Sequence, residues 1–153
     1  MNTIVHKAAP TESQTSQILV IEDDPLQAYE ISGFLGRQGF SVSTRSGGSD
    51  SLHEISRIDP TLVIVDYHLQ DIDGMTIAER IHRLLPNAAV ILISGRVDLL
   101  DNDILDRYGV VAFLKKPINL GNLRRLVFRL MKNPQLTRRE LRSPIARLLS
   151  LGR

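Results

Sequence analysis

Short apolar runs alternate with longer amphipathic segments along most of the chain. Unbroken runs rich in Val and Ile are typical of strands that are covered on both faces of a sheet. Apolar residues at i, i+4 and i+7 in the segments between them are typical of helices. The pattern predicts strands at residues 18–21, 40–44, 62–65, 90–93 and 110–114. The 40–44 run is the most polar, which places it near an edge of the sheet.

Proline, glycine and short polar residues mark the predicted helix ends. Asp24 before Pro25 is typical of an N-cap followed by a first-turn proline, and Gly39 stands where the first helix should end. Pro117 excludes an α-conformation at Lys116 and so ends the fifth strand. The fourth helix, expected over residues 97–107, has the weakest pattern because it contains four Asp residues.

The β-α unit is repeated five times, which predicts an α/β fold with a five-stranded parallel, doubly wound sheet. Helices are expected on both faces of this sheet. Residues 17–131 form the expected domain. Residues 1–16 are polar and aperiodic, and are expected to be a flexible leader. Residues 132–153 are expected to be a basic C-terminal extension.

The amino-acid composition excludes several classes of function. The chain has no cysteine, which excludes disulfides, a cysteine nucleophile and cysteine-ligated metal clusters. No apolar run approaches the ~20 residues that span a bilayer, and residues 1–17 lack the core of a signal peptide. We therefore expect a cytoplasmic protein without membrane contact. The extension holds six of the basic residues and one acid, so the net charge of +2 does not favour nucleic-acid binding by the domain.

Polar side chains follow four of the five predicted strands, and the carboxyl ends of parallel strands meet at one edge. They are Glu22, Asp23 and Asp24 after the first strand, Asp66 after the third, Ser94 after the fourth, and Lys115 and Lys116 after the fifth. Alone, most of them fit an ordinary role: Asp24 a helix cap, Glu22 and Asp23 a solvated turn, Ser94 a turn residue and the lysines solvated side chains. Asp66 follows a wholly apolar run, which makes a surface turn less favoured there. Their occurrence at successive strand ends favours a site.

Clustered carboxylates repel one another unless one is protonated or a cation binds. Oxygen ligands favour Mg²⁺ or Mn²⁺. A metal ion, a lysine and a hydroxyl group together can hold a phosphoryl group, and a carboxylate beside them can act as its nucleophile.

The chain resembles the receiver domain of two-component response regulators. The motifs are ILVIEDD at 18–24, LVIVD at 62–66 with Gly74 eight residues later, ILISG at 91–95 and AFLKKP at 112–117. The resemblance implies strand order 2-1-3-4-5 and a flavodoxin-like fold.

The resemblance also implies residue roles. Asp66 corresponds to the phosphoacceptor. It would bind Mg²⁺ together with Asp23 and the backbone carbonyl of His68, and Glu22 would act through a metal-bound water. Lys116 would pair with the incoming phosphoryl group. Ser94 would hydrogen-bond that group after transfer, and Phe113 corresponds to the aromatic switch residue.

The implied function is to accept a phosphoryl group from a sensor histidine kinase or a histidine phosphotransfer protein. The only chemistry would be self-phosphorylation and autodephosphorylation, and the output a change near the fourth helix and fifth strand. If the chain forms a homodimer, the face of the fourth helix and fifth strand or the C-terminal extension would form the interface. His68 and Arg96 flank the implied route of the hydrolytic water and are expected to tune the phosphoryl lifetime. Gln70 replaces a proline that is common in the family.

Alternatives remain open. Residues 136–142, LTRRELR, resemble the opening of a helix-turn-helix effector, but the remaining chain is too short to complete one. A single-domain regulator is therefore expected, with a longer transcription regulator as the alternative. Others are a Mg²⁺-dependent phosphatase or phosphotransferase and an unphosphorylated scaffold. Residues 145–151 would form an amphipathic arm or a frayed end.

Overall fold

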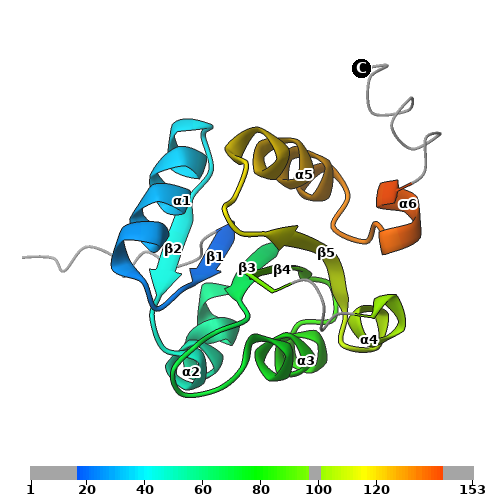
Figure 1. Cartoon of the computed structure of the whole chain (residues 1–153), viewed down its shortest axis with the longest axis horizontal. Helices are drawn as coiled ribbons and strands as arrows, with labels where there is room; N and C mark the ends of the chain where they lie inside the picture. Colours follow the sequence, from blue (N-terminus) through cyan, green and yellow to red (C-terminus); the bar gives the residue numbers. More distant parts are fainter. Residues whose placement is uncertain (1–16, 97–100, 143–153) are drawn as a thin grey trace, which may run out of the picture.

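Five parallel strands form one sheet in the order β2-β1-β3-β4-β5, which confirms the predicted fold (Figure 1). The computed structural model describes residues 17–96 and 101–142. The strands are β1 (Ile18–Ile21), β2 (Val42–Arg45), β3 (Leu62–Asp66), β4 (Ala89–Ser94) and β5 (Val110–Lys115).

Helices cover both faces of the sheet. They are α1 (Pro25–Arg37), α2 (Gly48–Ile58), α3 (Gly74–Leu84), α4 (Asn102–Arg107), α5 (Leu120–Lys132) and α6 (Arg138–Arg142). Figure 1 shows α1 and α5 on one face and α2, α3 and α4 on the other. None of the described helices is long and apolar enough to cross a membrane.

The apolar strand runs explain the layered core. Every residue of β1, β3 and β4 is buried, as expected for central strands covered on both faces. Alternate side chains enter two apolar clusters. One contains Ile55 and Ile77, from α2 and α3, and the other contains Ile31 and Val127, from α1 and α5. Full burial of one such side chain stabilises the fold by roughly 1.5–3 kcal/mol.

β3, β4 and β5 extend one residue beyond their predicted bounds at one or both ends, and β2 and the fourth helix differ more. β2 begins at Val42 rather than residue 40, because Phe40 packs edge-on against Phe128 of α5, with ring centroids 5.2 Å apart. α2 begins at Gly48, before its first apolar residue, because the Asp71 carboxylate accepts from the N–H groups of Gly48 and Ser49. Within the described residues, the fourth helix is limited to Asn102–Arg107, with Asp101 as its N-cap. Residues 97–100 of the predicted helix lie outside the described part.

Candidate functional site

The carboxyl ends of β1, β3, β4 and β5 bring Glu22, Asp66, Ser94 and Lys116 to one edge of the sheet. Parallel pairing sets this alignment, since Asp66 is in register with Ile93 and Ser94 with Lys115. The backbone N–H of Lys116 also donates to the carbonyl of Ser94 at 2.9 Å. The predicted convergence of strand-end side chains is therefore present.

Lys116 joins two buried carboxylates. Its Nζ donates to Asp66 Oδ2 at 2.8 Å and lies 3.6 Å from Glu22 Oε2. Both carboxyl side chains are almost completely buried. Burial raises the pKa of Glu22 to about 7, the neighbouring Asp66 carboxyl adds to the rise, and Lys116 opposes it. The carboxylates at this edge therefore carry more negative charge than the single Lys116 ammonium group neutralises. This excess of negative charge favours the binding of a cation.

The backbone positions the Asp66 carboxylate. The His68 N–H donates to Asp66 Oδ1 at 3.1 Å, so its two oxygens have different partners. Gly74 packs directly beneath this turn, and its N–H donates to the carbonyl of Tyr67 at 2.8 Å. A Cβ at Gly74 would lie 2.4 Å from the Asp66 carbonyl oxygen. This close approach explains the glycine eight residues after Asp66.

The β3–α3 loop supplies two contacts that sequence reasoning missed. The backbone N–H of Gln70 donates to Asp23 Oδ2 at 2.6 Å, a bond that proline at this position cannot make. Asp71 accepts from the N–H groups of Gly48 and Ser49, and so caps α2 from 23 and 22 positions away in the chain. Because these bonds use backbone donors on distant segments, no local pattern indicates them.

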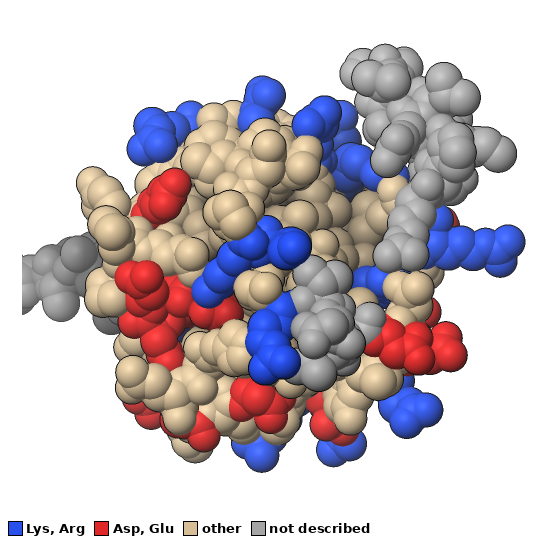
Figure 2. Space-filling view, viewed as in Figure 1, with Lys and Arg blue, Asp and Glu red and all other residues tan. Residues whose placement is uncertain are grey.

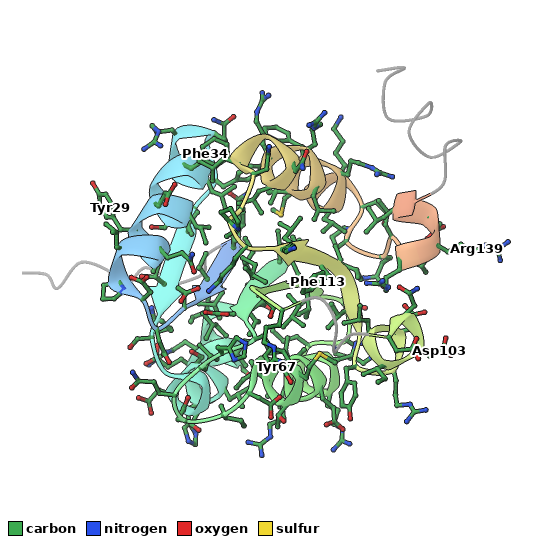
Figure 3. The ribbon with its side chains drawn as sticks, in the orientation of Figure 1. Tyr29, Phe34, Tyr67, Asp103, Phe113 and Arg139 are labelled. Atoms are coloured by element: carbon green, nitrogen blue, oxygen red, sulfur yellow. The ribbon has the colours of Figure 1, made fainter. Side chains whose placement is uncertain are left out.

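Ser94 ends β4, and Phe113 lies within the neighbouring strand β5. Ser94 is buried, and its Oγ accepts from the Arg96 N–H at 3.0 Å. Phe113 is half-buried on β5, opposite Leu92. Figure 3 shows Phe113 and Tyr67 inside the domain, and both pack against the core cluster beneath α3 and α4.

Other strand-end residues have local roles. Asp24 caps α1 by accepting from the N–H groups of Leu26 and Gln27. Lys115 is exposed. The ring of His68 packs edge-on against Tyr67, with centroids 4.9 Å apart.

The oxygen ligands at this edge are suitable for Mg²⁺, provided that only a few of its ligands come from the protein. Among the described residues, no three acidic or histidine side chains form a ready metal cluster. Mg²⁺ keeps several waters and needs only one or two carboxylates. Asp23 and Asp66 place carboxylates at the ends of the neighbouring strands β1 and β3, and Glu22 Oε2 is a buried oxygen without a hydrogen-bond partner. Figure 2 shows acidic side chains gathered near the start of α1, with basic side chains toward the middle of this face.

The sequence matches the family described as "Response regulator receiver domain" over residues 18–128. The chain belongs to this family. This receiver domain is 30% identical over 127 residues to the nitrogen assimilation regulatory protein NtrX of Azorhizobium caulinodans, covering 82% of the chain and 28% of the relative. It is 29% identical over 104 residues to the transcriptional regulatory protein GlrR of Escherichia coli, covering 68% and 23%. The chain thus spans about a quarter of these relatives.

Solved structures agree with this fold. The receiver domain of NtrX from Brucella abortus is similar with a TM-score of 0.70 and 26% identity, covering 76% of this chain and 98% of that one. A CheY-like receiver domain from Methanospirillum hungatei has a TM-score of 0.72 and 23% identity, covering 77% and 94%, which supports the fold alone. Receiver domains are signalling modules of response regulators, which interact with histidine kinases.

Proposed function

We propose that this receiver domain accepts a phosphoryl group on Asp66 from a histidine-bound donor and signals through a change in its own conformation. The contact that carries this proposal is the 2.8 Å bond between Lys116 Nζ and Asp66 Oδ2 at the sheet edge. It places a cation beside a buried carboxylate, where an incoming phosphoryl group needs both a nucleophile and charge neutralisation.

In the transfer step, a carboxylate oxygen of Asp66 attacks phosphorus and the phosphorus–nitrogen bond to the donor histidine breaks. The electron pair of that bond stays on the imidazole, so no separate acid or base is needed. Lys116 meets the transferred oxygens, and Ser94 Oγ donates to one of them afterwards. Hydrolysis returns Asp66 when water attacks phosphorus, and the products are phosphate and free carboxylate.

Asp23, Asp66 and the carbonyl of His68 would hold Mg²⁺, with Glu22 bound through a water. When bound, Mg²⁺ supplies positive charge to the transferring oxygens. Glu22 keeps the raised pKa of a crowded carboxyl when the metal is absent. The backbone N–H of Gln70 donates to Asp23 Oδ2 and would therefore compete with Mg²⁺ for this carboxylate.

The donor is a sensor histidine kinase or a histidine phosphotransfer protein. His68 and Arg96 border Asp66 and Ser94, and both would alter the approach of the hydrolytic water. Phe113 would follow Ser94 when the serine turns toward the phosphoryl group. The resulting change would reach the surface around α4 and β5, where a protein partner or a second copy reads it.

Fluoroberyllate binding tests the site without relying on transfer. Fluoroberyllate with Mg²⁺ mimics an aspartyl phosphate, and the chain should bind it in a 1:1 complex detected by tyrosine fluorescence or NMR shifts around Asp66. Asp66→Asn should abolish this binding, while Asp71→Asn, which changes a carboxylate of the same loop, should retain it. Equal binding by wild type and Asp66→Asn would refute the assignment.

A further inference from the structure

Residues 133–142, here called the C-terminal clasp, run around the free edge of the sheet. β5 is the last strand, and α6 contacts it while lying between α5 and α4 (Figure 1). Leu136 and Leu141 pack against the apolar cluster of the α5 face. Arg129 of α5 donates to the carbonyl of Leu141 at 2.9 Å. The clasp is therefore attached to α5 on one face of the sheet.

Arg138 attaches the same segment to α4 on the opposite face. Its Nη2 donates to Asn102 Oδ1 at 2.6 Å, and its Nε lies 3.2 Å from Asp106 Oδ1. The arginine is 8% exposed, which is rare for a charged side chain unless it is paired. A single buried guanidinium thus links the C-terminal clasp to the helix nearest the predicted output surface.

Local sequence makes the C-terminal clasp an ordered element. Thr137 and Glu140 form a capping box: the Thr137 N–H donates to Glu140 Oε2 at 2.7 Å, and the Glu140 N–H donates to Thr137 Oγ at 3.3 Å. Gln135 Nε2 donates to the carbonyl of Asn87 at 3.0 Å. α6 begins where this box predicts.

The packing beneath the clasp is incomplete. A groove of about 360 Å³ lies between the clasp and the start of β5, lined by His82, Asp106, Val110, Pro134 and Arg138 among others. Leu136 and Leu141 pack against the apolar cluster of the α5 face. An element at the edge of the sheet that is held by two leucines and a few polar links opens at lower free energy than the core does.

α4 connects this link to the phosphorylation site. It follows Ser94 by eight residues in the chain, and its buried Leu105 shares an apolar cluster with Phe113. A change at Ser94 and Phe113 would therefore reach the helix that carries Asn102 and Asp106. We propose that the C-terminal clasp is held on α4 and β5 in the unphosphorylated state and is released when Asp66 carries a phosphoryl group.

Release would free the edge of β5 and expose Leu136 and Leu141. This inference rests on the proposed function, because the release is driven by the group on Asp66. Thermodynamic linkage makes this coupling reciprocal. If binding at Asp66 increases the fraction of molecules with an open clasp, then opening the clasp must increase the affinity of the Asp66 site by the same factor. The two directions can be measured separately.

The first measurement is amide hydrogen exchange of residues 137–142, with and without fluoroberyllate and Mg²⁺. Exchange should rise by about fivefold or more on binding. The second is fluoroberyllate affinity in Arg138→Gln, which removes the guanidinium, and in Asp106→Ala, which removes one of its two acceptors on α4. Each should bind about fivefold more tightly than wild type. Asp106 has a largely exposed side chain, so its variant should fold even if Arg138→Gln does not.

Arg139→Gln is the matched control. It removes the same charge from the same helix; Arg139 also borders the groove, but its side chain is exposed and extends outward (Figure 3). It should bind as wild type does. Unchanged exchange on binding, or wild-type affinity in both Arg138→Gln and Asp106→Ala, would overturn the clasp while leaving the Asp66 assignment intact. Absence of any fluoroberyllate binding by wild type would instead overturn the proposed function, and the clasp with it.

Discussion

Lys116 Nζ lies 2.8 Å from Asp66 Oδ2 and 3.6 Å from Glu22 Oε2, so one ammonium group faces carboxylates that follow two other strands. β4 separates β3 from β5, and only the parallel register brings these ends together. The pair of buried acids and their shared lysine define the chemistry of the edge.

Removing the ammonium group should slow phosphorylation. Lys116→Ala is expected to lower the rate of labelling by acetyl phosphate about 10²-fold, the scale of losing one preorganised charge at a transferring group. Lys115→Ala is the matched control, because the neighbouring lysine is exposed. It should label at the wild-type rate. Equal slowing in both variants would contradict a specific role for Lys116.

Glu22 should make the metal-free protein less stable as the pH rises. The carboxyl titrates near pH 4.5 in the unfolded chain and near 7 in the folded domain. Between these values the folded state binds more protons, so this stabilisation is complete below pH 4.5 and is lost as the pH passes 7. Relative to Glu22→Gln, wild type should lose on the order of 2 kcal/mol between pH 5 and 8.

Urea unfolding in EDTA measures this difference. Glu30→Gln, at an exposed position of α1, should follow wild type at both pH values. A constant difference between wild type and Glu22→Gln across the range would show that the pKa of Glu22 is not raised.

A side chain at Gly74 should damage the turn that carries Asp66. The added Cβ of Gly74→Ala would lie 2.4 Å from the Asp66 carbonyl oxygen and 2.6 Å from the Tyr67 Cα. Overpacking of this kind costs about 1–3 kcal/mol, which thermal unfolding would detect. Gly36→Ala is the control, since nothing lies within 4 Å of its Cβ position. It should leave stability unchanged or raise it; a similar loss in both would exclude the local clash.

The departure at Gln70 should affect metal binding. Gln70→Pro removes the N–H that donates to Asp23 Oδ2, so Mg²⁺ no longer competes with this bond. We expect Mg²⁺ to bind about threefold to tenfold more tightly, the effect of about one hydrogen bond. Gln70→Ala keeps the N–H and should match wild type in a fluorescence titration with Mg²⁺. Weaker binding in the proline variant would reverse this interpretation.

The apolar runs predicted the sheet well because central strands are buried on both faces. β1 has the predicted bounds, and the site residues Asp66 and Lys116 follow from the ends of such runs. The domain bounds 17–131 and the site roles themselves remain predictions.

Contacts between distant segments were not predictable in the same way. The start of α2 depends on Asp71, and the start of β2 on the packing of Phe40 against α5. Residues 136–142 were interpreted by their resemblance to an effector motif. Their docking depends on the pairing of Arg138 with Asp106, 32 positions earlier in the chain. The local periodicity of apolar residues cannot predict contacts between positions that are distant in the chain. The predicted leader and the arm at residues 145–151 lie outside the described residues.

The most direct test of the account is intact mass after incubation with acetyl phosphate, with Mg²⁺ and with EDTA, beside Asp66→Asn. The account predicts one phosphoryl adduct that requires Mg²⁺, maps to Asp66 and is absent from the variant. An adduct of the same extent in Asp66→Asn, or one that forms equally in EDTA, would contradict it.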